Sequence, residues 1–261
     1  MDCDRLLACP DCRRPALATA PEGYACGSCG ATYIVRDGVP VFLRPRTAIA
    51  GADADRAAFW DAGWEKRNNR LLALDREGVL KERQDYLEYV LKERYPSAVD
   101  IGPDVVAGKT FLNIGCGGGF EGLLFAGYGA HYIGVDFSQN AVRLTRDLIR
   151  NAGFDGVAFQ AEAEALPFRD GSIEYVYSSG VLHHTPNIEQ AMKEACRVLA
   201  PGGTAMIALY ATRSLMFFWY RLHAVLCGNL TLKAIEAWMH ANTEGAWQTA
   251  GRKNKWTKTY T

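Results

Sequence analysis

The 261-residue chain lacks an excess of either charge, because 29 Lys and Arg side chains balance 29 Asp and Glu side chains. A dedicated nucleic-acid-binding protein carries a basic surface that neutralises phosphates. The sequence has no such overall footprint, although a local basic patch is compatible with a neutral total. The charge balance therefore favours a small-molecule substrate over RNA or DNA.

The chain also lacks a hydrophobic leader and an uninterrupted run long enough to cross a bilayer. The apolar, aromatic stretch at 213–230 is interrupted by Arg221 and His223, whereas a spanning helix needs about 20 apolar residues. We expect no transmembrane segment and a cytoplasmic, reducing location. The stretch itself is compatible with a lid over a hydrophobic substrate, an interface helix or a buried helix.

Half of the eight cysteines stand at metal-ligand spacing. Cys9, Cys12, Cys26 and Cys29 form two C-x2-C pairs separated by thirteen residues, which is typical of two knuckles that hold one tetrahedral zinc. Four thiolates leave no open coordination position, so the spacing predicts a structural metal. The segment is too short for a large core, and metal binding would supply much of its folding free energy. Two disulfides or free thiols are the alternative.

Glycines interrupt a short apolar run at 110–122 and predict a ligand-binding turn. Gly115, Gly117 and Gly119 follow a predicted strand and precede a predicted helix, and Asp136 closes the next predicted strand. Glycines permit positive φ and let the backbone approach a ligand closely. The Asp136 carboxylate can accept hydrogen bonds from both hydroxyls of a ribose. The pattern indicates a nucleoside-bearing cofactor.

The segments at 161–187 and 197–210 follow this loop in an order that resembles the class I S-adenosylmethionine-dependent methyltransferases. The resemblance covers about 110–210. It implies that the glycine loop holds the methionine end of the cofactor, that Asp136 holds the ribose and that Glu162, with the backbone of Ala163, meets the adenine amino group. The cofactor-binding residues implied are Asn113, Gly115, Cys116, Gly117, Gly119, Asp136, Phe137, Glu162, Ala163 and Ser179.

Two positions depart from the family pattern. The family usually has aspartate where this chain has Glu162, and an acid where it has Asn113. An amide accepts a hydrogen bond without charge, and charge-assisted bonds are roughly twice as strong as neutral ones. We therefore expect cofactor binding that survives but is weakened.

A dinucleotide site is the rival interpretation of the loop, since Gly117, Gly119 and Gly122 also satisfy G-x-G-x-x-G with Asp136 downstream. The later segments at 161–187 and 197–210 have no role in a nicotinamide enzyme. The order of the motifs therefore favours a methyltransferase over a dehydrogenase.

His183 and His184 form the only adjacent histidine pair and follow the fourth predicted strand. An imidazole titrates near neutrality, so either ring is a candidate general base for the methyl acceptor. The alternative is that the pair orients the loop or packs beside the cofactor. The other cysteines, Cys3, Cys116, Cys196 and Cys227, are interpreted as packing residues.

Strands that alternate with helices predict an α/β, Rossmann-like, doubly wound and mostly parallel sheet behind a small zinc ribbon. The expected strands are 111–114, 131–135, 157–160, 173–178 and 203–210, and the expected helices start at 120 and cover 139–151 and 187–199. We divide the chain into a zinc ribbon at 1–46, amphipathic helices at 51–108 after a linker, and a methyltransferase domain at 109–261. The terminal β-hairpin of similar enzymes is not recognisable, which indicates a fragment.

The ribbon resembles zinc modules that precede some bacterial methyltransferases, and the resemblance leaves its partner open. The leading hypothesis is transfer of a methyl group from S-adenosylmethionine to a small, hydrophobic acceptor. An RNA methyltransferase that recognises RNA through the ribbon, and a cofactor-binding scaffold without turnover, are the alternatives. A protein partner at the ribbon is a further expectation.

Overall fold

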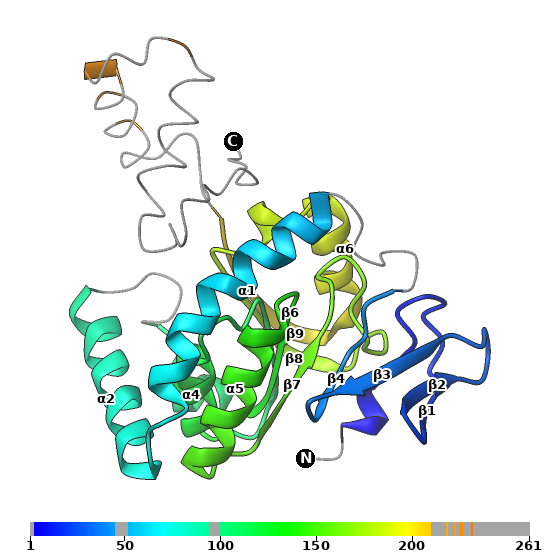
Figure 1. Cartoon of the computed structure of the whole chain (residues 1–261), viewed down its shortest axis with the longest axis horizontal. Helices are drawn as coiled ribbons and strands as arrows, with labels where there is room; N and C mark the ends of the chain where they lie inside the picture. Colours follow the sequence, from blue (N-terminus) through cyan, green and yellow to red (C-terminus); the bar gives the residue numbers. More distant parts are fainter. Residues whose placement is uncertain are drawn as a thin grey trace.

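The computed structural model describes residues 3–44, 52–93 and 100–209, with single residues at 218, 222, 225, 226 and 231. The expected linker at 45–51, most of the apolar stretch at 213–230, Cys227 and the end of the chain lie outside the described residues. The expectation about a terminal hairpin falls in this last part. Figure 1 shows a central sheet, the helices around it and the N-terminal module at one side.

The central sheet is parallel and has the order β7-β6-β5-β8-β9. Its strands are β5 (Thr110–Ile114), β6 (His131–Asp136), β7 (Gly156–Gln160), β8 (Ile173–Ser179) and β9 (Leu199–Ala208). The helices between them are α4 (Phe120–Gly127), α5 (Gln139–Ala152), the 3-10 turn η3 (Leu182–His184) and α6 (Ile188–Val198). The predicted Rossmann-like α/β fold is confirmed. Strand β9 begins earlier than expected because Leu199 already pairs with Ile173 across a register shift.

Side chains alternate between the two faces of the sheet, as the pleat requires. Phe111 packs with Phe125 of α4 on one face. Leu112 belongs to the core on the other face, which includes Ala191 of α6. Both faces of β5 are therefore covered, which places this strand at the centre of the fold.

The N-terminal module is an antiparallel meander whose buried side chains belong to the same core as Leu112. It contains the 3-10 turn η1 (Asp4–Leu6), β1 (Leu17–Ala20), β2 (Gly23–Cys26), β3 (Thr32–Arg36) and β4 (Val39–Pro40). The fully buried Phe42 packs edge-on against Phe159 of β7, with ring centroids 5.6 Å apart.

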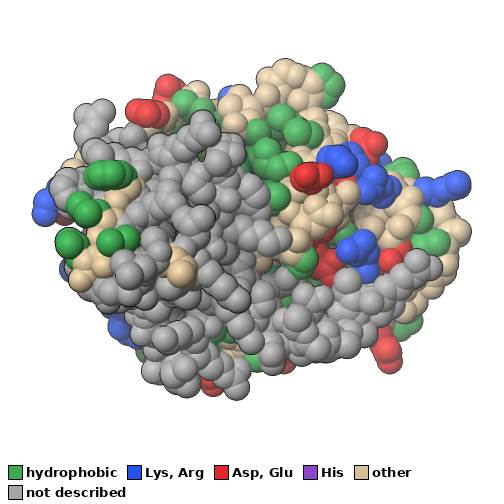
Figure 2. Space-filling model, turned by 90° about the horizontal axis from the view of Figure 1, so that it is seen from above, with side chains coloured by type: hydrophobic (Ala, Val, Ile, Leu, Met, Phe, Trp, Pro, Cys, Tyr) green, Lys and Arg blue, Asp and Glu red, His purple; other side chains and the backbone are tan. Residues whose placement is uncertain are grey.

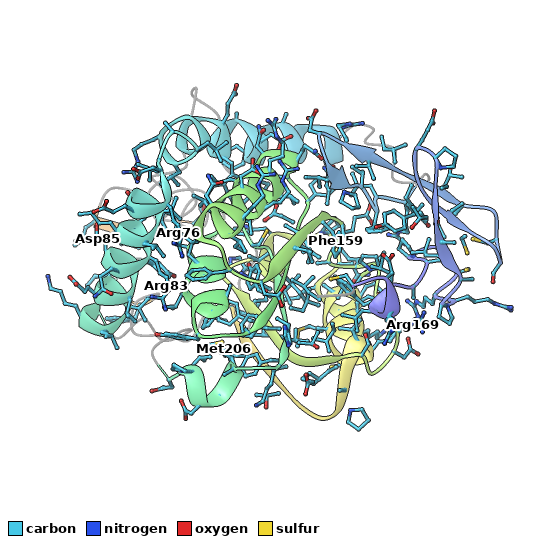
Figure 3. All side chains as sticks on the ribbon, turned by 90° about the horizontal axis from the view of Figure 1, so that it is seen from below. Arg76, Arg83, Asp85, Phe159, Arg169 and Met206 are labelled. Carbon is cyan, nitrogen blue, oxygen red and sulfur yellow. The ribbon has the colours of Figure 1, made fainter. Side chains whose placement is uncertain are left out.

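Backbone contacts also join the module to the sheet domain. Leu7 bridges Phe168, and Arg169 donates from Nε to the Leu7 carbonyl at 3.1 Å. Figure 3 shows Arg169 beside the N-terminal turn. The module is thus continuous with the main core, a packing that the spacing of the cysteines does not reveal.

Two long helices precede the sheet, α1 (Ala52–Leu71) and α2 (Arg76–Glu93), followed by the short α3 (Pro103–Val106). Asp61 of α1 accepts hydrogen bonds from the Ser138 hydroxyl and from the backbone N–H of Asn140 at the start of α5. A carboxylate at a helix N-terminus is stabilising because the first N–H groups lack helical partners. Through this contact α1 lies across the edge of the sheet where the strands end (Figure 1).

Candidate functional site

A pocket of about 520 Å³ lies at the carboxyl ends of the strands. The chain winds from β5 to β6 and β7 in one direction and returns to β8 and β9 on the other side of β5. In open α/β sheets ligands bind where the strand order reverses. The loops that follow β5 and β8 therefore meet at the expected position of a ligand.

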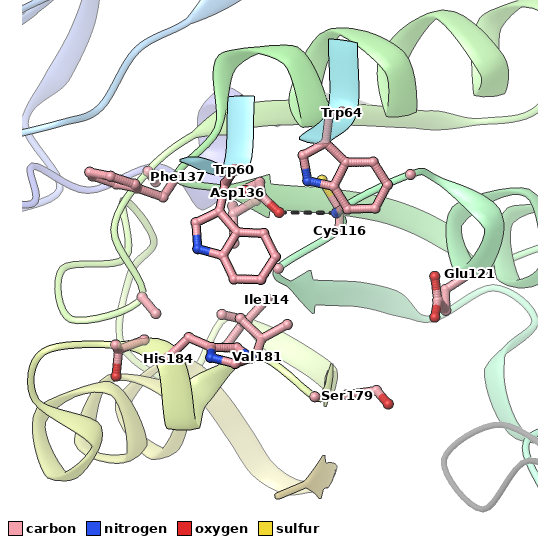
Figure 4. A pocket seen from close by; sticks show the side chains of 18 of the residues that line it. Trp60, Trp64, Ile114, Cys116, Glu121, Asp136, Phe137, Ser179, Val181 and His184 are labelled. Atoms are coloured by element: carbon pink, nitrogen blue, oxygen red, sulfur yellow. Dashed lines mark hydrogen bonds between the residues drawn. The ribbon is translucent and has the colours of Figure 1, made fainter. Parts of the chain in front are cut away.

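The glycine positions of the loop have no room for side chains. Gly115 has φ 81°, and an added Cβ would lie 2.3 Å from Val181. Gly117 has φ 50°, and its Cβ would lie 2.7 Å from the ring of Trp64. Positive φ and these close approaches both require glycine. Trp64 of α1 covers the loop from above, as Figure 4 shows.

Asp136 joins this loop to the end of β6. Its Oδ2 accepts from the Gly117 N–H at 3.0 Å and its Oδ1 from the Ser138 N–H at 2.8 Å. Burial raises the pKa of Asp136 to about 6, and the nearby Asp61 adds to the increase. A carboxylate offers about four lone-pair positions, so Asp136, which lines the pocket, retains acceptor capacity for ligand hydroxyls.

The acid after β7 also lines the pocket. Glu162 is 6% exposed and stands beside Ala163, another lining residue. Its Oε2 accepts two hydrogen bonds from Arg44, which follows the N-terminal meander. Arg44 is a site residue that sequence reasoning missed, because no local signal links positions 118 apart.

The charge of the pocket lining is one-sided. Four carboxylates line it, those of Glu121, Asp136, Glu162 and Glu164, and no Lys or Arg of the described residues does so. Glu121 was also missed by sequence reasoning, although an acid in the first turn of the helix after a glycine loop is a usable signal. The Tyr86 hydroxyl donates to Glu121 Oε1 at 3.0 Å, and burial raises the pKa of Glu121. Figure 4 shows Glu121 and Phe137 on opposite sides of the pocket.

The structure separates the two histidines. His184 lines the pocket, and its ring lies 5.2 Å from that of Trp60. His183 is fully buried and is not among the lining residues, although the two rings are 4.2 Å apart. Only His184 is placed where it could meet a ligand.

The other expected cofactor residues are divided in the same way. Cys116, Phe137 and Ser179 line the pocket. Burial raises the pKa of Cys116 well above its usual value, so this residue is a neutral thiol. Gly119 and Asn113 are not among the lining residues. Asn113 is buried and donates from Nδ2 to the Tyr132 hydroxyl at 3.0 Å. The structure therefore does not bring Asn113 to the pocket.

The four N-terminal cysteines meet in one cluster. Their sulfur atoms all lie within 4.8 Å of one another, with Cys9 to Cys29 at 3.7 Å and Cys12 to Cys26 at 3.6 Å. Tetrahedral zinc with Zn–S bonds of about 2.3 Å places its sulfur ligands about 3.8 Å apart. The geometry of the cluster therefore fits a closed tetrahedral site.

The electrostatics of the module also bear on a metal. Burial raises the pKa of Cys26, but backbone hydrogen bonds at Cys29 and Ser28 outweigh it and lower that pKa to about 7. The Tyr33 hydroxyl, 3.2 Å from Cys9 Sγ, donates to Asp11 at 2.7 Å. Burial raises the pKa of Cys9, and the pKa values of Cys12 and Cys29 are also raised. Cys26 is therefore the one cysteine of the cluster whose pKa shift favours the thiolate that metals require.

The surface of the described residues carries both charges, and their helices are not of the membrane-spanning kind. In Figure 2 the basic and acidic side chains of the described residues are interspersed toward one end of the molecule. Within the described ranges, no helix combines the length and the apolar character needed to cross a bilayer.

Part of the chain is similar to known methyltransferases. Residues 112–207 match a family model described as a methyltransferase domain. An uncharacterised chloroplastic methyltransferase of Arabidopsis thaliana is 25% identical, over 76% of this chain and 60% of its own length. The demethylmenaquinone methyltransferase of Shouchella clausii is 30% identical, over 54% of this chain and 65% of its own length. The chain thus spans less than two thirds of either relative.

Solved structures include similar chains. The YcgJ protein of Bacillus subtilis is 28% identical, and the alignment covers 46% of this chain and 52% of that protein with a TM-score of 0.40.

Proposed function

We propose that this chain binds S-adenosylmethionine and transfers its methyl group to a small, apolar acceptor. The observation that carries the proposal is the pocket at the strand-order reversal, which combines a glycine loop, Asp136 and a carboxylate lining without Lys or Arg among the described residues. The family match over 112–207 supports the same activity.

The charge of the lining distinguishes the candidate cofactors. S-adenosylmethionine carries a cationic sulfonium and a cationic amine, whereas the pyrophosphate of a nicotinamide dinucleotide is anionic. Opposite charges within a few ångströms attract and like charges repel, most strongly where water is excluded. The carboxylates of Glu121, Asp136 and Glu164 therefore favour the sulfonium cofactor, whereas Arg44 compensates the charge of Glu162. The same three carboxylates also oppose the phosphates of an RNA acceptor.

Each end of the pocket offers groups that suit one part of this cofactor. Asp136 accepts the ribose hydroxyls, and the buried Glu162 Oε1, which has no hydrogen-bond partner in the described chain, accepts the adenine amino group. Glu121, at the opposite side from Phe137, pairs with the amine of the methionine end. In this assignment Glu121 provides the charge that Asn113 lacks.

When bound, the cofactor supplies a methyl group whose carbon bonds to the acceptor as its bond to sulfur breaks and leaves the electron pair on sulfur. Trp60, Trp64 and Val181 exclude water and align the acceptor with that carbon. Alignment of this kind accounts for a large part of the rate enhancement of such displacements. His184 receives the proton where the acceptor atom carries one.

The aromatic lining indicates the acceptor class. Trp60, Tyr86, Tyr89 and Phe120 contribute rings to the same pocket, and such surfaces favour flat or apolar molecules. The similarity to a demethylmenaquinone methyltransferase is consistent with an acceptor of this kind. The cytoplasmic location and a protein partner at the N-terminal module remain predictions.

We also propose that the four-cysteine cluster binds structural zinc. The sulfur positions suit tetrahedral coordination. The ion would hold the two C-x2-C turns together and would take no part in methyl transfer, because its coordination is complete.

Calorimetric titration of the chain with S-adenosylhomocysteine, and separately with NAD, tests the proposal. We expect micromolar binding of S-adenosylhomocysteine and no detectable binding of NAD. Transfer of a labelled methyl group to a panel of small apolar acceptors then separates an enzyme from a binding scaffold. Preferential binding of NAD by the folded chain would overturn the proposal.

Affinity for S-adenosylhomocysteine is expected to fall as the pH is lowered through about 6, by up to tenfold per pH unit. The pKa of Asp136 is about 6 in the unliganded chain, and a protonated carboxyl accepts ribose hydroxyls poorly. The stability of the unliganded chain depends on pH in the opposite sense. Because the folded-state pKa is above the usual 3.8, the contribution of Asp136 is complete below 3.8 and is lost as the pH rises through about 6.

Titrations between pH 5 and 8, with Asp136→Asn as the control, measure the effect. The variant has no carboxyl group at this position and should show a flat profile in this range. An equal pH dependence in both proteins would assign the effect to another group.

A further inference from the structure

We propose that the N-terminal module is part of the cofactor site, because its Arg44 holds the carboxylate of Glu162 in position to recognise a purine that carries a 6-amino group. This inference rests on the proposed function. It assigns to Arg44 a positioning role in ligand specificity and gives the module a function in the pocket.

The fold brings Arg44 to Glu162 by a short path. Val41 forms a parallel bridge with Gln160 at the end of β7, and the Phe42 N–H donates to the Gln160 carbonyl at 2.7 Å. Phe42 is fully buried, which anchors the segment. The two chain segments then continue side by side, so that Arg44 arrives opposite Glu162. Arg44 is therefore positioned by the docking of the module and not by its own local structure.

The hydrogen bonds are unevenly distributed over the Glu162 carboxylate. Two nitrogens of Arg44 donate to Glu162, and both bond the same oxygen, Oε2: Nε at 3.1 Å and Nη2 at 2.7 Å. Glu162 Oε1 is buried and has no partner within the described residues. A purely structural Arg–Glu pair commonly uses both carboxylate oxygens in two parallel bonds. Here Arg44 holds one oxygen of a residue that lines the pocket, while the other oxygen is buried without a partner among the described residues.

The energetics favour a donor ligand at this oxygen. Glu162 is only 6% exposed, and a buried acceptor without a partner is unfavourable. Arg44 compensates the charge of Glu162 without occupying the pocket, since it is not a lining residue. The 6-amino group of adenine would satisfy Oε1, whereas the 6-oxo group of hypoxanthine would face a second acceptor. Discrimination between these two bases is the expected consequence.

The test compares S-adenosylhomocysteine with S-inosylhomocysteine by calorimetric titration. We expect the unmodified chain to bind the adenine ligand roughly tenfold or more tightly, as loss of a charge-assisted bond implies. Arg44→Met keeps a long apolar stem but loses the charge and the donors, so it should lower this ratio to near one. Arg44→Lys should restore part of the ratio.

A matched control is available at the same interface. Arg169 also joins the module to the sheet domain, but its side chain donates to the Leu7 carbonyl and not to a residue that lines the pocket. Arg169→Met should leave the adenine-to-hypoxanthine ratio unchanged, even where it lowers stability. The double variant Arg44→Met, Glu162→Gln should lose little more discrimination than Glu162→Gln alone, because the two residues act as a unit.

Each outcome has a separate meaning. A ratio that falls in Arg44→Met but not in Arg169→Met supports the proposal. Equal weakening of both ligands, or no change, would overturn it and make the ion pair structural. Absence of binding by the folded, unmodified chain would instead contradict the proposed cofactor.

Discussion

Replacing Asp136 with alanine should lower the affinity for S-adenosylhomocysteine roughly a hundredfold or more. Two charge-assisted hydrogen bonds to the ribose would be lost, each of which contributes about 1.5 to 3 kcal/mol. The change also removes the acceptor for the Gly117 N–H, which is one of the hydrogen bonds between the glycine loop and β6. Calorimetric titration near pH 7.5, where the Asp136 carboxyl is ionised, measures the loss.

Two variants control for indirect effects. Asp155→Ala removes a half-exposed carboxylate that pairs with His131 away from the pocket, and it should bind normally. Asp136→Asn keeps the size of the side chain and an acceptor oxygen, so its affinity should lie between those of the unmodified chain and Asp136→Ala. Binding of Asp136→Ala within a few-fold of the unmodified chain would remove this residue from the site.

Replacing Cys9 with serine should abolish stoichiometric zinc binding and lower the melting temperature by about 10 °C. Structural zinc contributes folding free energy directly, and a few kcal/mol shift the melting temperature of a domain of this size by several degrees. Cys9 is buried in the core that also contains Phe42 and Leu112. Damage at the cluster should therefore reach the central sheet and not remain confined to the module.

Zinc content by atomic emission and melting followed by circular dichroism give the two readouts. Cys196→Ser is the matched control, because Cys196 is an exposed cysteine outside the cluster. It should retain one zinc per chain and the original melting temperature. An unmodified, reduced chain that contains no zinc would contradict the metal assignment. If the four cysteines instead form disulfides, mass spectrometry before and after reduction would detect them.

Patterns over short stretches of sequence predicted the parallel sheet, the glycine loop and the cysteine cluster. The parallel sheet follows from strands that alternate with helices, and the glycine loop follows from residues spaced within one turn. Gly115, Gly117 and Asp136 were expected together, and the structure places all three at one pocket. The cysteine spacing similarly anticipated the cluster of four sulfur atoms. In each case the relevant residues are close in sequence or are related by a regular strand order.

Other features depended on which face a side chain takes. Asn113 was expected at the cofactor, yet it turns toward Tyr132 in the layer between the sheet and its helices. His183 and His184 are equivalent in the sequence, but the turn η3 buries one and directs the other to the pocket. Neighbouring residues of a strand point to opposite faces of the sheet. The sequence motif alone does not show which of two adjacent residues faces the pocket.

The sequence by itself determined the α/β fold, the glycine loop with its acid, and the cysteine spacing, because these depend on backbone freedom and periodicity over short distances. Only the tertiary structure decided that Trp64 covers Gly117, that Tyr86 donates to Glu121 and that Arg44 holds Glu162. These contacts join segments far apart in the chain. They arise from how α1, α2 and the N-terminal module pack against the sheet, and packing is set by the whole core and not by any one segment.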